Sequence, residues 1–483
     1  MSKINKMDRN QMILTTFCLD DLVDENNPAR GIDVFVNYLD LKSLGFKEFS
    51  TGKKGQQPYN RAELLKLHIY GYLNGVKSSR KLEKECHRNI ELMWLTNCIT
   101  PDHGTISAFI KDNRNTFKRV MQKLTLDLKS FGLVDLSLFT VDGTKIRAQN
   151  SKNNTISLTT IEKKMEYVNG QIEKYVSFMT EESSETTKIE EKLSHYNELK
   201  AKYEQQKQIL IDEKLETKAL NDEDSRKMKN HGTLEMCYNV QSVVESKNHF
   251  ILEIDTTNDI NDENQLYDMT LKTKDLLCNE HDEITVMADT GYYNCLEIKK
   301  CIDEKIKVII KKSKANNSTK ESMFKKDRFI YDKEKDVYIC PNDKNLGFFE
   351  NSSKNGLKYR RYKCSDCLSC PFKEKCTTSK TGRTIQRWEY ESILEDVHSF
   401  TLENEDIYQK RRNIVEHPFG YFKRALHFTY FNRKGLNNVD AETQLMGIAY
   451  NLRRLFTMFP KVQDLEKVFS IKQKEYQTSY IVV

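Results

Sequence analysis

Two apolar runs of this chain each lead into an aspartate, and this repeated pattern constrains the fold more than any other feature. Asp142 follows the run 138–141 and Asp289 follows the run 284–288, with a glycine within two residues of each. Aspartate is rare in strands, and burying its charge is costly unless the carboxylate is paired or bound to a metal. In a layered α/β protein, carboxylates at or near strand ends converge at the edge of the sheet. Two such aspartates therefore indicate a metal pair with the oxygen ligands that Mg²⁺ prefers.

A third acid, Glu416, stands almost alone in a basic segment. Between Lys410 and Asp440 there are seven lysines and arginines and two acids, and aromatic residues are interleaved with them. A basic helix face is usually only solvated. A lone carboxylate among cations and rings indicates instead a phosphate backbone held beside a metal ion.

Hydrophobic spacing predicts the elements around these acids. Residues 61 to about 126 are expected to be helical, with Ser78 and Ser79 placed to cap a second helix. Short helices with tight turns suit a helix-turn-helix reader of DNA, although the pattern alone favours a plain helical bundle. Residues 156–229 are rich in Lys and Glu, contain no proline and have a broken heptad, which predicts a helical insertion such as a hairpin. Strands are expected within 232–245, 249–258, 283–294 and 307–312, and helix within 264–277 and from about 403 to 458.

Composition limits the class of protein. The chain has 483 residues, too many for one ordinary core, and 31% of them are charged. No apolar run approaches the roughly 18 residues of a membrane span, and the N-terminal segment lacks the apolar block of a signal peptide. We therefore expect a cytoplasmic protein without a membrane partner, whose 12 cysteines are thiols or metal ligands. The net charge of +6 is only weak evidence for a nucleic-acid partner.

Five cysteines lie close together in a polar region of the sequence. Cys340 is followed by Cys364, Cys367, Cys370 and Cys376, and this series includes two C-x-x-C steps. Such spacing in a cytosolic chain indicates a tetrahedral Zn²⁺ site, with reduced thiols as the alternative. Five cysteines compete for four positions.

Several motifs together resemble those of a DDE-type transposase of a bacterial insertion sequence, a family with an RNase H-like catalytic domain. The likeness covers residues 10 to about 460 and is carried, in the family's order, by GYLNGVKSSRKLEKECHRNIELMWL, PDHGTISAFIKDN, TVDGTKIRAQNSK, YNVQ, MADTGYYN and RRNIVEHPFGYFKRALHFTYFNRKGL. The resemblance implies that Asp142, Asp289 and Glu416 form a catalytic triad. It also implies that they hold two Mg²⁺ (or Mn²⁺) ions for in-line phosphoryl displacement on DNA.

The resemblance also assigns neighbouring residues. Arg412, Glu416 and Lys423 fit the family's arginine–glutamate–lysine spacing, whereas Tyr408 has the expected separation from Arg411 and is one residue too far from Arg412. The residues expected to hold DNA phosphates are Lys145, Arg147, Arg411, Arg412, Lys423, Arg424 and Arg433. The resemblance favours Cys340, Cys367, Cys370 and Cys376 as zinc ligands, with Cys364 as the alternative.

The sequence thus predicts an α+β multidomain protein. It comprises a helical N-terminal DNA-binding region (1–130), an RNase H-like mixed-sheet α/β catalytic core (135–155, 230–314 and 401–460), a helical insertion (156–229), a Cys-rich, zinc-binding insertion (315–400) and a C-terminal tail (461–483). Its expected partners are the terminal inverted repeats, target DNA and a second copy of the chain, at the nucleoid of a bacterium. Two rival functions are a metal-dependent nuclease that does not join strands and a domesticated DNA-binding protein without catalysis.

Overall fold

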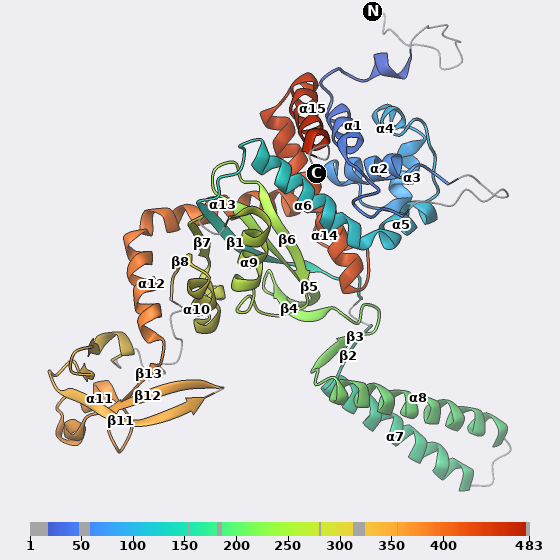
Figure 1. Ribbon diagram of the computed structural model, residues 1–483. Coiled ribbons are helices and arrows are strands. Elements are labelled where there is room, and N and C mark those ends of the chain that lie inside the picture. The colour runs from blue at the N-terminus through green and yellow to red at the C-terminus, as the bar shows by residue number, and fades with distance from the viewer. Residues whose placement is uncertain are drawn as a thin grey trace, which may run out of the picture. The chain divides into compact units, whose positions relative to one another are not determined.

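The structure is a computed structural model that describes residues 18–47, 58–151, 154–180, 186–279, 282–312, 324–354 and 356–479 (Figure 1). Its contacts divide the chain into two compact units. The first unit comprises residues 1–261, 272–281 and 412–483, and the second comprises residues 262–271 and 282–411. The fold is mixed α/β with a helical N-terminal region, as the sequence predicts.

The N-terminal part of the first unit is helical. A short 3₁₀ turn, η1 (Leu19–Leu22), precedes α1 (Pro28–Tyr38), α2 (Arg61–Leu73), α3 (Ser79–Cys86), α4 (Ile90–Leu95), α5 (His103–Asp112) and α6 (Arg114–Ser130). The side chains of Asn27, Asn60, Asn89 and Asp102 accept backbone N–H bonds at the starts of α1, α2, α4 and α5, which satisfies donors that a helix leaves unpaired. Residues 64–73 of α2 are all buried, because α1, α4 and the long C-terminal helix α14 (Leu436–Met458) pack around this helix. The last helix, α15 (Val462–Ser479), packs on α1.

An antiparallel group of strands forms the rest of the core of the first unit. β1 (Leu138–Arg147) pairs with β5 (Thr233–Glu245), and β5 also pairs with β4 (Arg226–Asn230) and β6 (Ile251–Thr257). The register places Asp142 opposite Ser242. α6 and α14 pack on β6, and β5 is buried from Met236 to its end. The buried part of β5 includes polar residues such as Asn239 and Gln241.

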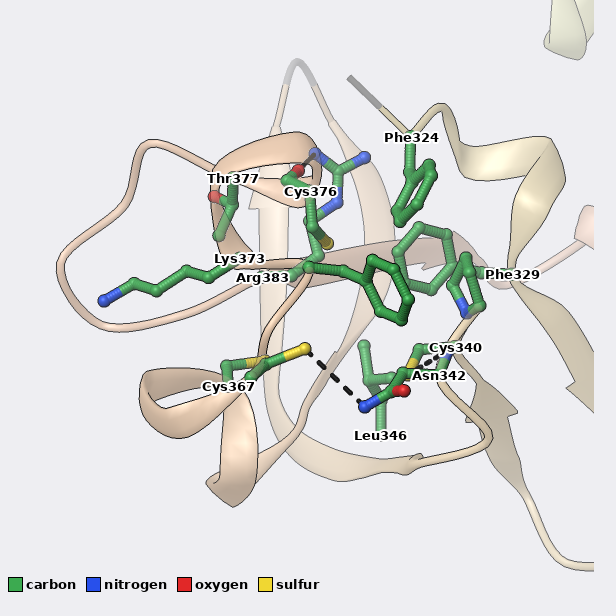
Figure 2. A pocket seen from close by; sticks show the side chains of 13 residues that line it. Phe324, Phe329, Cys340, Asn342, Leu346, Cys367, Lys373, Cys376, Thr377 and Arg383 are labelled. Atoms are coloured by element: carbon green, nitrogen blue, oxygen red, sulfur yellow. Dashed lines mark hydrogen bonds between the residues drawn. The ribbon is translucent and has the colours of Figure 1, made fainter. Parts of the chain in front are cut away.

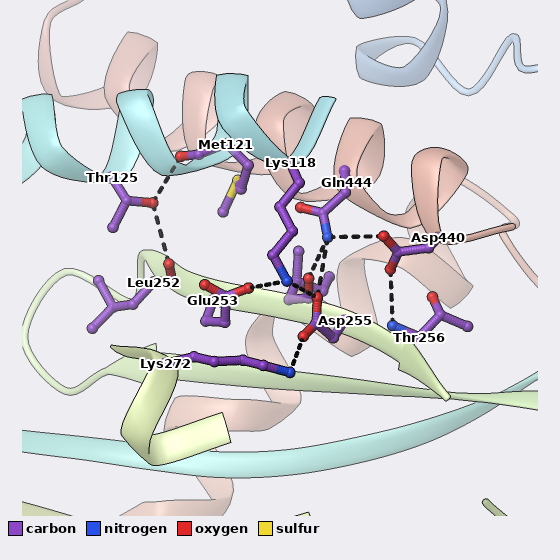
Figure 3. A network of polar contacts seen from close by, with 11 residues as sticks. Lys118, Met121, Thr125, Leu252, Glu253, Asp255, Thr256, Lys272, Asp440 and Gln444 are labelled. Atoms are coloured by element: carbon purple, nitrogen blue, oxygen red, sulfur yellow. Dashed lines mark hydrogen bonds and ion pairs between the residues drawn. The ribbon is translucent and has the colours of Figure 1, made fainter. Parts of the chain in front are cut away.

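A buried polar network ties helices to strand β6 within the first unit (Figure 3). Lys118 of α6 pairs with Glu253 at 3.2 Å and with Asp255 at 2.6 Å, and Lys272 pairs with Asp255 at 2.8 Å. Burial raises the pKa of Glu253 and raises that of Asp440 on α14 to about 6, and the charge of Asp255 adds to both shifts. The network therefore has three carboxyl groups, those of Glu253, Asp255 and Asp440, but only the two positive charges of Lys118 and Lys272.

Residues 226–229 of the segment predicted as a helical insertion (156–229) belong to strand β4, and the rest of that segment contains a helical hairpin. β2 (Thr155–Ser157) and β3 (Thr217–Ala219) pair at its base, and α7 (Leu158–Thr180) packs along α8 (Thr186–Asp212). Leu210 is buried with Ile156 and Ile161 near the base, and the rings of Tyr175 and Tyr196 stack at 5.7 Å further along. These contacts hold two mainly polar helices together.

The second unit has a parallel strand pair and a separate antiparallel sheet. β7 (Ile284–Ala288) and β8 (Ile306–Ile310) are parallel and are connected through η3 (Thr290–Tyr292) and α10 (Cys295–Asp303). The second sheet has the order β13 (Thr384–Trp388), β12 (Leu357–Lys363), β11 (Asn345–Lys354), β10 (Val337–Ile339) and β9 (Ile330–Asp332). The unit also contains η4 (Lys326–Arg328), η5 (Ser365–Ser369), α11 (Lys373–Cys376) and α12 (Glu391–Glu403). Two helices, α9 (Leu266–Leu277) and α13 (Glu405–Gly420), begin in the second unit and end in the first.

In the part of the chain that the structure describes, no helix is both long enough and apolar enough to cross a bilayer.

Candidate functional site

Strand β1 carries Asp142 to the point where the strand emerges from the core. Phe139, Thr140 and Val141 are fully buried, whereas residues 142–145 are half-buried. The Nζ of Lys423 lies close by and donates to the carbonyl of Lys145 at 3.0 Å. Burial lowers the pKa of Lys423, and the attraction of nearby groups, including Asp142, opposes that shift. The carboxylate of Asp142 and the ammonium group of Lys423 thus attract each other in a half-buried part of the first unit.

Helix α13 carries Glu416 on an exposed face. Its side chain is 59% exposed and accepts from Nε of Arg412, one turn earlier, at 2.6 Å. This hydrogen bond raises the pKa of Arg412. The structure therefore pairs Glu416 with Arg412, as the spacing of the family signature implies.

The helix expected from 403 to 458 is interrupted, and that prediction was wrong in its middle. α13 contains Pro418 and ends at Gly420, after which the chain forms a π-helical turn, η6 (Tyr421–Ala425). Helix resumes only at α14, where Gly435 has a φ of +80°, a backbone conformation that favours glycine. Proline removes a helical hydrogen bond, which explains why the regular helix stops here. Single π turns are frequent at functional sites.

The segment after the π-helical turn is fastened to strand β1. Arg147 N donates to the carbonyl of Thr429 at 3.2 Å, and Phe431 N donates to the carbonyl of Arg147 at 2.9 Å. Because of these bonds, the chain that follows Glu416 lies beside the strand that carries Asp142. Lys145, Arg147 and Lys423 are brought together in this way, as three of the predicted DNA contacts.

The other predicted phosphate contacts of the first unit lie on the same segment. Arg424 is exposed, and the guanidinium of Arg433 donates to the carbonyl of Ser107 at 3.1 Å. Sequence reasoning missed Lys77, which donates to the carbonyl of Tyr430 and lies 4.2 Å from the centre of its ring. Lys77 directly precedes the predicted cap of α3, but nothing in the sequence pairs it with a residue so far along the chain.

Asp289 belongs to the second unit and ends strand β7. Its side chain accepts from Thr290 N at 2.7 Å and is 53% exposed. Arg411 pairs with Asp289 at 3.5 Å and lies 5.8 Å from the ring of Tyr408, which Lys311 approaches at 4.8 Å. Asp289 is thus paired with Arg411, as Glu416 is paired with Arg412. Tyr408 lies beside Arg411, in agreement with the separation of these two residues in the sequence.

The three acids are accessible oxygen donors. Asp142 and Glu416 belong to the first unit and Asp289 to the second. Within the described ranges, no three His, Cys, Asp or Glu side chains are grouped closely enough to hold a metal ion. The donor chemistry nevertheless suits a hard divalent cation, because all three are carboxylates, of which Asp289 and Glu416 are exposed and Asp142 is half-buried.

Four of the five clustered cysteines line one small cavity of the second unit (Figure 2). The cavity has a volume of about 30 Å³ and is lined by Cys340, Cys367, Cys370 and Cys376. Cys364 lies instead in the adjoining apolar core. The backbone N–H groups of Asn342 and Lys344 both donate to Sγ of Cys340 at 3.4 Å.

The remaining cysteines are dispersed through the described parts of the chain. Cys86, Cys237 and Cys301 are buried, whereas Cys18 and Cys98 are exposed. They are ordinary core and surface residues.

Comparison with known proteins gives two family matches. The model described as a transposase DDE domain matches residues 339–456, and the model described as a transposase domain, DUF772, matches residues 17–112. The first range contains Arg412, Glu416 and Lys423, and the second contains helices α1 to α5. A solved structure of the piggyBac transposase in a synaptic complex with hairpin DNA is similar over 92% of this chain and 79% of that chain, with 7% identity and a TM-score of 0.33. No curated protein matches the chain.

Proposed function

Since this chain carries a DDE transposase domain and is a phosphoryl-transfer enzyme acting on DNA, we propose that it transposes an insertion sequence. It binds the terminal inverted repeats, cleaves a DNA strand at each end, and joins the freed end to target DNA. The observation that carries the proposal is the position of Glu416. This acid lies inside the matched DDE domain and pairs with Arg412. Lys423, which follows it in the chain, donates to the carbonyl of Lys145 on the strand that carries Asp142.

The proposed catalytic residues are Asp142, Asp289 and Glu416, in an RNase H-like core. Two Mg²⁺ or Mn²⁺ ions held by these carboxylates would activate the attacking oxygen and stabilise the leaving 3′ oxygen. A water molecule attacks in the cleavage step, and the freed 3′ hydroxyl attacks in the joining step. In the cleavage step a P–O bond to water forms while the P–O bond to the 3′ oxygen breaks. In the joining step a P–O bond to the 3′ hydroxyl forms while one phosphodiester bond of the target breaks, so no oxidant or reductant is required in either step.

The surrounding cations position the DNA. Lys145, Arg147, Lys423, Arg424 and Arg433 are held by β1 and by the segment fastened to it, where their charges face a phosphate backbone. Arg411 and Arg412 pair with Asp289 and Glu416, and they would be available to phosphate if these carboxylates held metal ions instead. Phosphate contacts of this kind fix the register of a duplex without reading its sequence.

A structural Zn²⁺ is the second proposed metal. Four thiols around one cavity of about 30 Å³ form the donor set that zinc prefers, and Cys364, in the core, is not needed. Binding would draw the four sulfurs to a common centre and stabilise the five-stranded sheet, whose own apolar core is small.

The partners follow from the reaction. Joining two ends of one element to one target requires both ends to be held together, so at least two copies of the chain assemble with the terminal repeats and target DNA. The helices of residues 60–125 would read the repeats, because base edges are read by elements placed in a groove of DNA.

A strand-transfer assay tests the proposal. Purified protein, Mg²⁺, terminal-repeat duplex and a circular target should yield joined product as well as cleaved ends. Cleavage without joining would identify a nuclease, and binding without cleavage would identify a DNA-binding protein that has lost catalysis. Either result would overturn the proposal.

A further inference from the structure

A large basic hollow lies in the first unit, beside the strand that carries Asp142. This groove of about 780 Å³ is lined by the starts of α3 and α5, by Gln149 just beyond β1, and by residues 432–434 and Asn438 after the π-helical turn. Its walls therefore come from parts of the chain that are more than 300 residues apart in sequence. The sequence places only Arg433 of this lining among DNA contacts.

Five cations line the groove, and the lining includes no carboxylate among the residues that the structure describes. Lys77 and Arg433 are half-buried, whereas Arg80, Lys111 and Lys434 are exposed. Among the residues that the structure describes, one acid that attracts both members of the half-buried pair lies inside the protein. This acid is Glu442, which is 1% exposed and accepts from Asn432 N at 3.0 Å. The exposed cations thus leave the groove strongly positive.

Other polar groups in the groove are donors of the kind that bind phosphate. The hydroxyls of Ser78, Ser79 and Ser107 line it beside the cations. Ser78 is the N-cap of α3 and makes no side-chain capping bond, and the start of α5 also opens on the groove. Serine hydroxyls, helix N-termini and Lys or Arg side chains are the groups that proteins place on phosphate oxygens.

Direct bonds tie the two walls of the groove to each other. Arg433 donates to the carbonyl of Ser107 on α5 at 3.1 Å, and Lys77 donates to the carbonyl of Tyr430. Tyr430 in turn bridges to Arg147, the last residue of β1. A ligand held in the groove therefore has a fixed position relative to strand β1 and Asp142.

We infer that this groove binds the sugar-phosphate backbone of duplex DNA, with the N-terminal helices and the segment after Glu416 gripping the same stretch. The inference rests on the proposed function and deepens it by naming the residues that place the DNA. The occupant is a polyanion because the five cations are spread over a groove much larger than one phosphate. Duplex DNA presents phosphates at regular spacing along such a trough. The N-terminal helices then supply affinity as well as sequence reading.

Two variants test the two walls separately. Arg80→Gln/Lys111→Gln removes two exposed charges from the α3–α5 wall, and Lys434→Gln removes one from the opposite wall. A matched control, Lys84→Gln/Lys227→Gln, removes two exposed charges of the same unit outside the groove. All of these side chains are exposed, so the fold should survive, and circular dichroism verifies this.

The readout is the salt dependence of binding to terminal-repeat duplex and to random duplex. Each lost phosphate contact should flatten the log–log slope by roughly 0.9, so the double variant should lose nearly 2 and Lys434→Gln about 0.9. At 0.1 M salt the double variant should bind both duplexes roughly tenfold to a hundredfold more weakly. The control should retain the wild-type slope.

Cleavage of the terminal repeat by the wild type, measured in parallel, distinguishes failure of the groove inference from failure of the proposed function. If the wild type cleaves and joins DNA while both groove variants keep its slope and affinity, the groove inference is wrong and the proposed function stands. The groove inference is equally wrong if the variants lose binding of single-stranded RNA or of an acidic peptide but not of duplex DNA. If the wild type neither binds nor cleaves the repeat, both the inference and the proposed function are wrong.

Discussion

Replacing Asp440 by asparagine should stabilise the first unit at neutral and alkaline pH and have no effect in acid. Burial, with the nearby charge of Asp255, raises the pKa of Asp440 from 3.8 to about 6. A shift of about 2 units corresponds to roughly 3 kcal/mol, since one unit is ~1.4 kcal/mol. A carboxyl group whose pKa is raised on folding binds more protons in the folded state, so its contribution to stability falls as pH rises from about 4 to about 6. Above pH 7 the full cost of the buried charge is present.

Asparagine keeps the main contact without the charge. Its amide oxygen can still accept from Thr256 N, which lies 3.0 Å from the carboxylate, and the weaker contact from Gln444 at 3.5 Å is lost. We therefore expect Asp440→Asn to be more stable than the wild type by ~1–3 kcal/mol at pH 8, with the difference vanishing near pH 4. The buried His68, whose pKa is lowered to about 3, gives wild type and variant the same opposing slope, so it cancels in the difference.

Fluorescence of a single tryptophan makes this difference measurable in the first unit alone. The chain has two tryptophans, Trp94 in the first unit and Trp388 in the second. In a Trp388→Phe background, urea unfolding followed through Trp94 gives the free energy at each pH. Asp112→Asn, which removes an exposed carboxylate from the same unit, is the matched control. A difference between Asp440→Asn and wild type that is constant from pH 5 to pH 8, or that favours the wild type at pH 8, would refute the reasoning.

Three further predictions concern zinc, DNA and packing. Metal analysis of protein prepared without chelator should find about one Zn²⁺ per chain. The Cys370→Ser variant should lose this zinc, and the Cys364→Ser variant should retain it. Absence of zinc from the wild type would show that the four cysteines are thiols without a metal. Arg424→Gln should weaken binding to terminal-repeat and random duplex by the same factor and flatten the salt slope by roughly 0.9, whereas a loss confined to the repeat would make Arg424 a base contact. Gly71→Ala should cost ~1–3 kcal/mol in unfolding experiments, because its Cβ would lie 2.6 Å from the carbonyl of Val76, while Gly170→Ala, which meets nothing within 4 Å, should cost nothing.

Local patterns in the sequence predicted the elements that carry the candidate acids. The apolar runs before Asp142 and Asp289 form buried strands, because a continuous apolar run of this length suits a strand with both faces covered. The N-terminal helices and the helical hairpin were also predicted, since helical periodicity and missing prolines act over a few turns. The resemblance to the family signature placed Arg412 at the matching separation from Glu416 but left open whether Arg411 or Arg412 is the partner, and the structure pairs Arg412 with Glu416.

Features that depend on distant or irregular contacts could not be predicted. The π-helical turn after Gly420 could not be predicted from the helical pattern, although Pro418 explains why the regular helix stops nearby. The bonds of Arg147 with Thr429 and Phe431 fasten the following chain to β1, and they join residues far apart in the sequence. The groove joins Arg80 and Lys111 to Lys434, and no local pattern links such remote residues. The five-stranded sheet around the cysteines was missed for two reasons. Strands β9 and β10 have only three residues each, too few to show a period. The longer strands β11 and β12 are mostly polar and poorly buried, so they lack a clear apolar pattern.

The central claim is that three carboxylates perform DNA cleavage, and the most direct measurement is Mg²⁺-dependent nicking of a terminal-repeat duplex by single variants. Asp142→Asn, Asp289→Asn and Glu416→Gln keep the size of each side chain and remove its charge. Each should abolish nicking while binding of the duplex, measured in the same samples, stays close to that of the wild type, because these groups hold metal and not DNA. Near-normal nicking by any one of the three variants would remove that residue from the site and contradict the account.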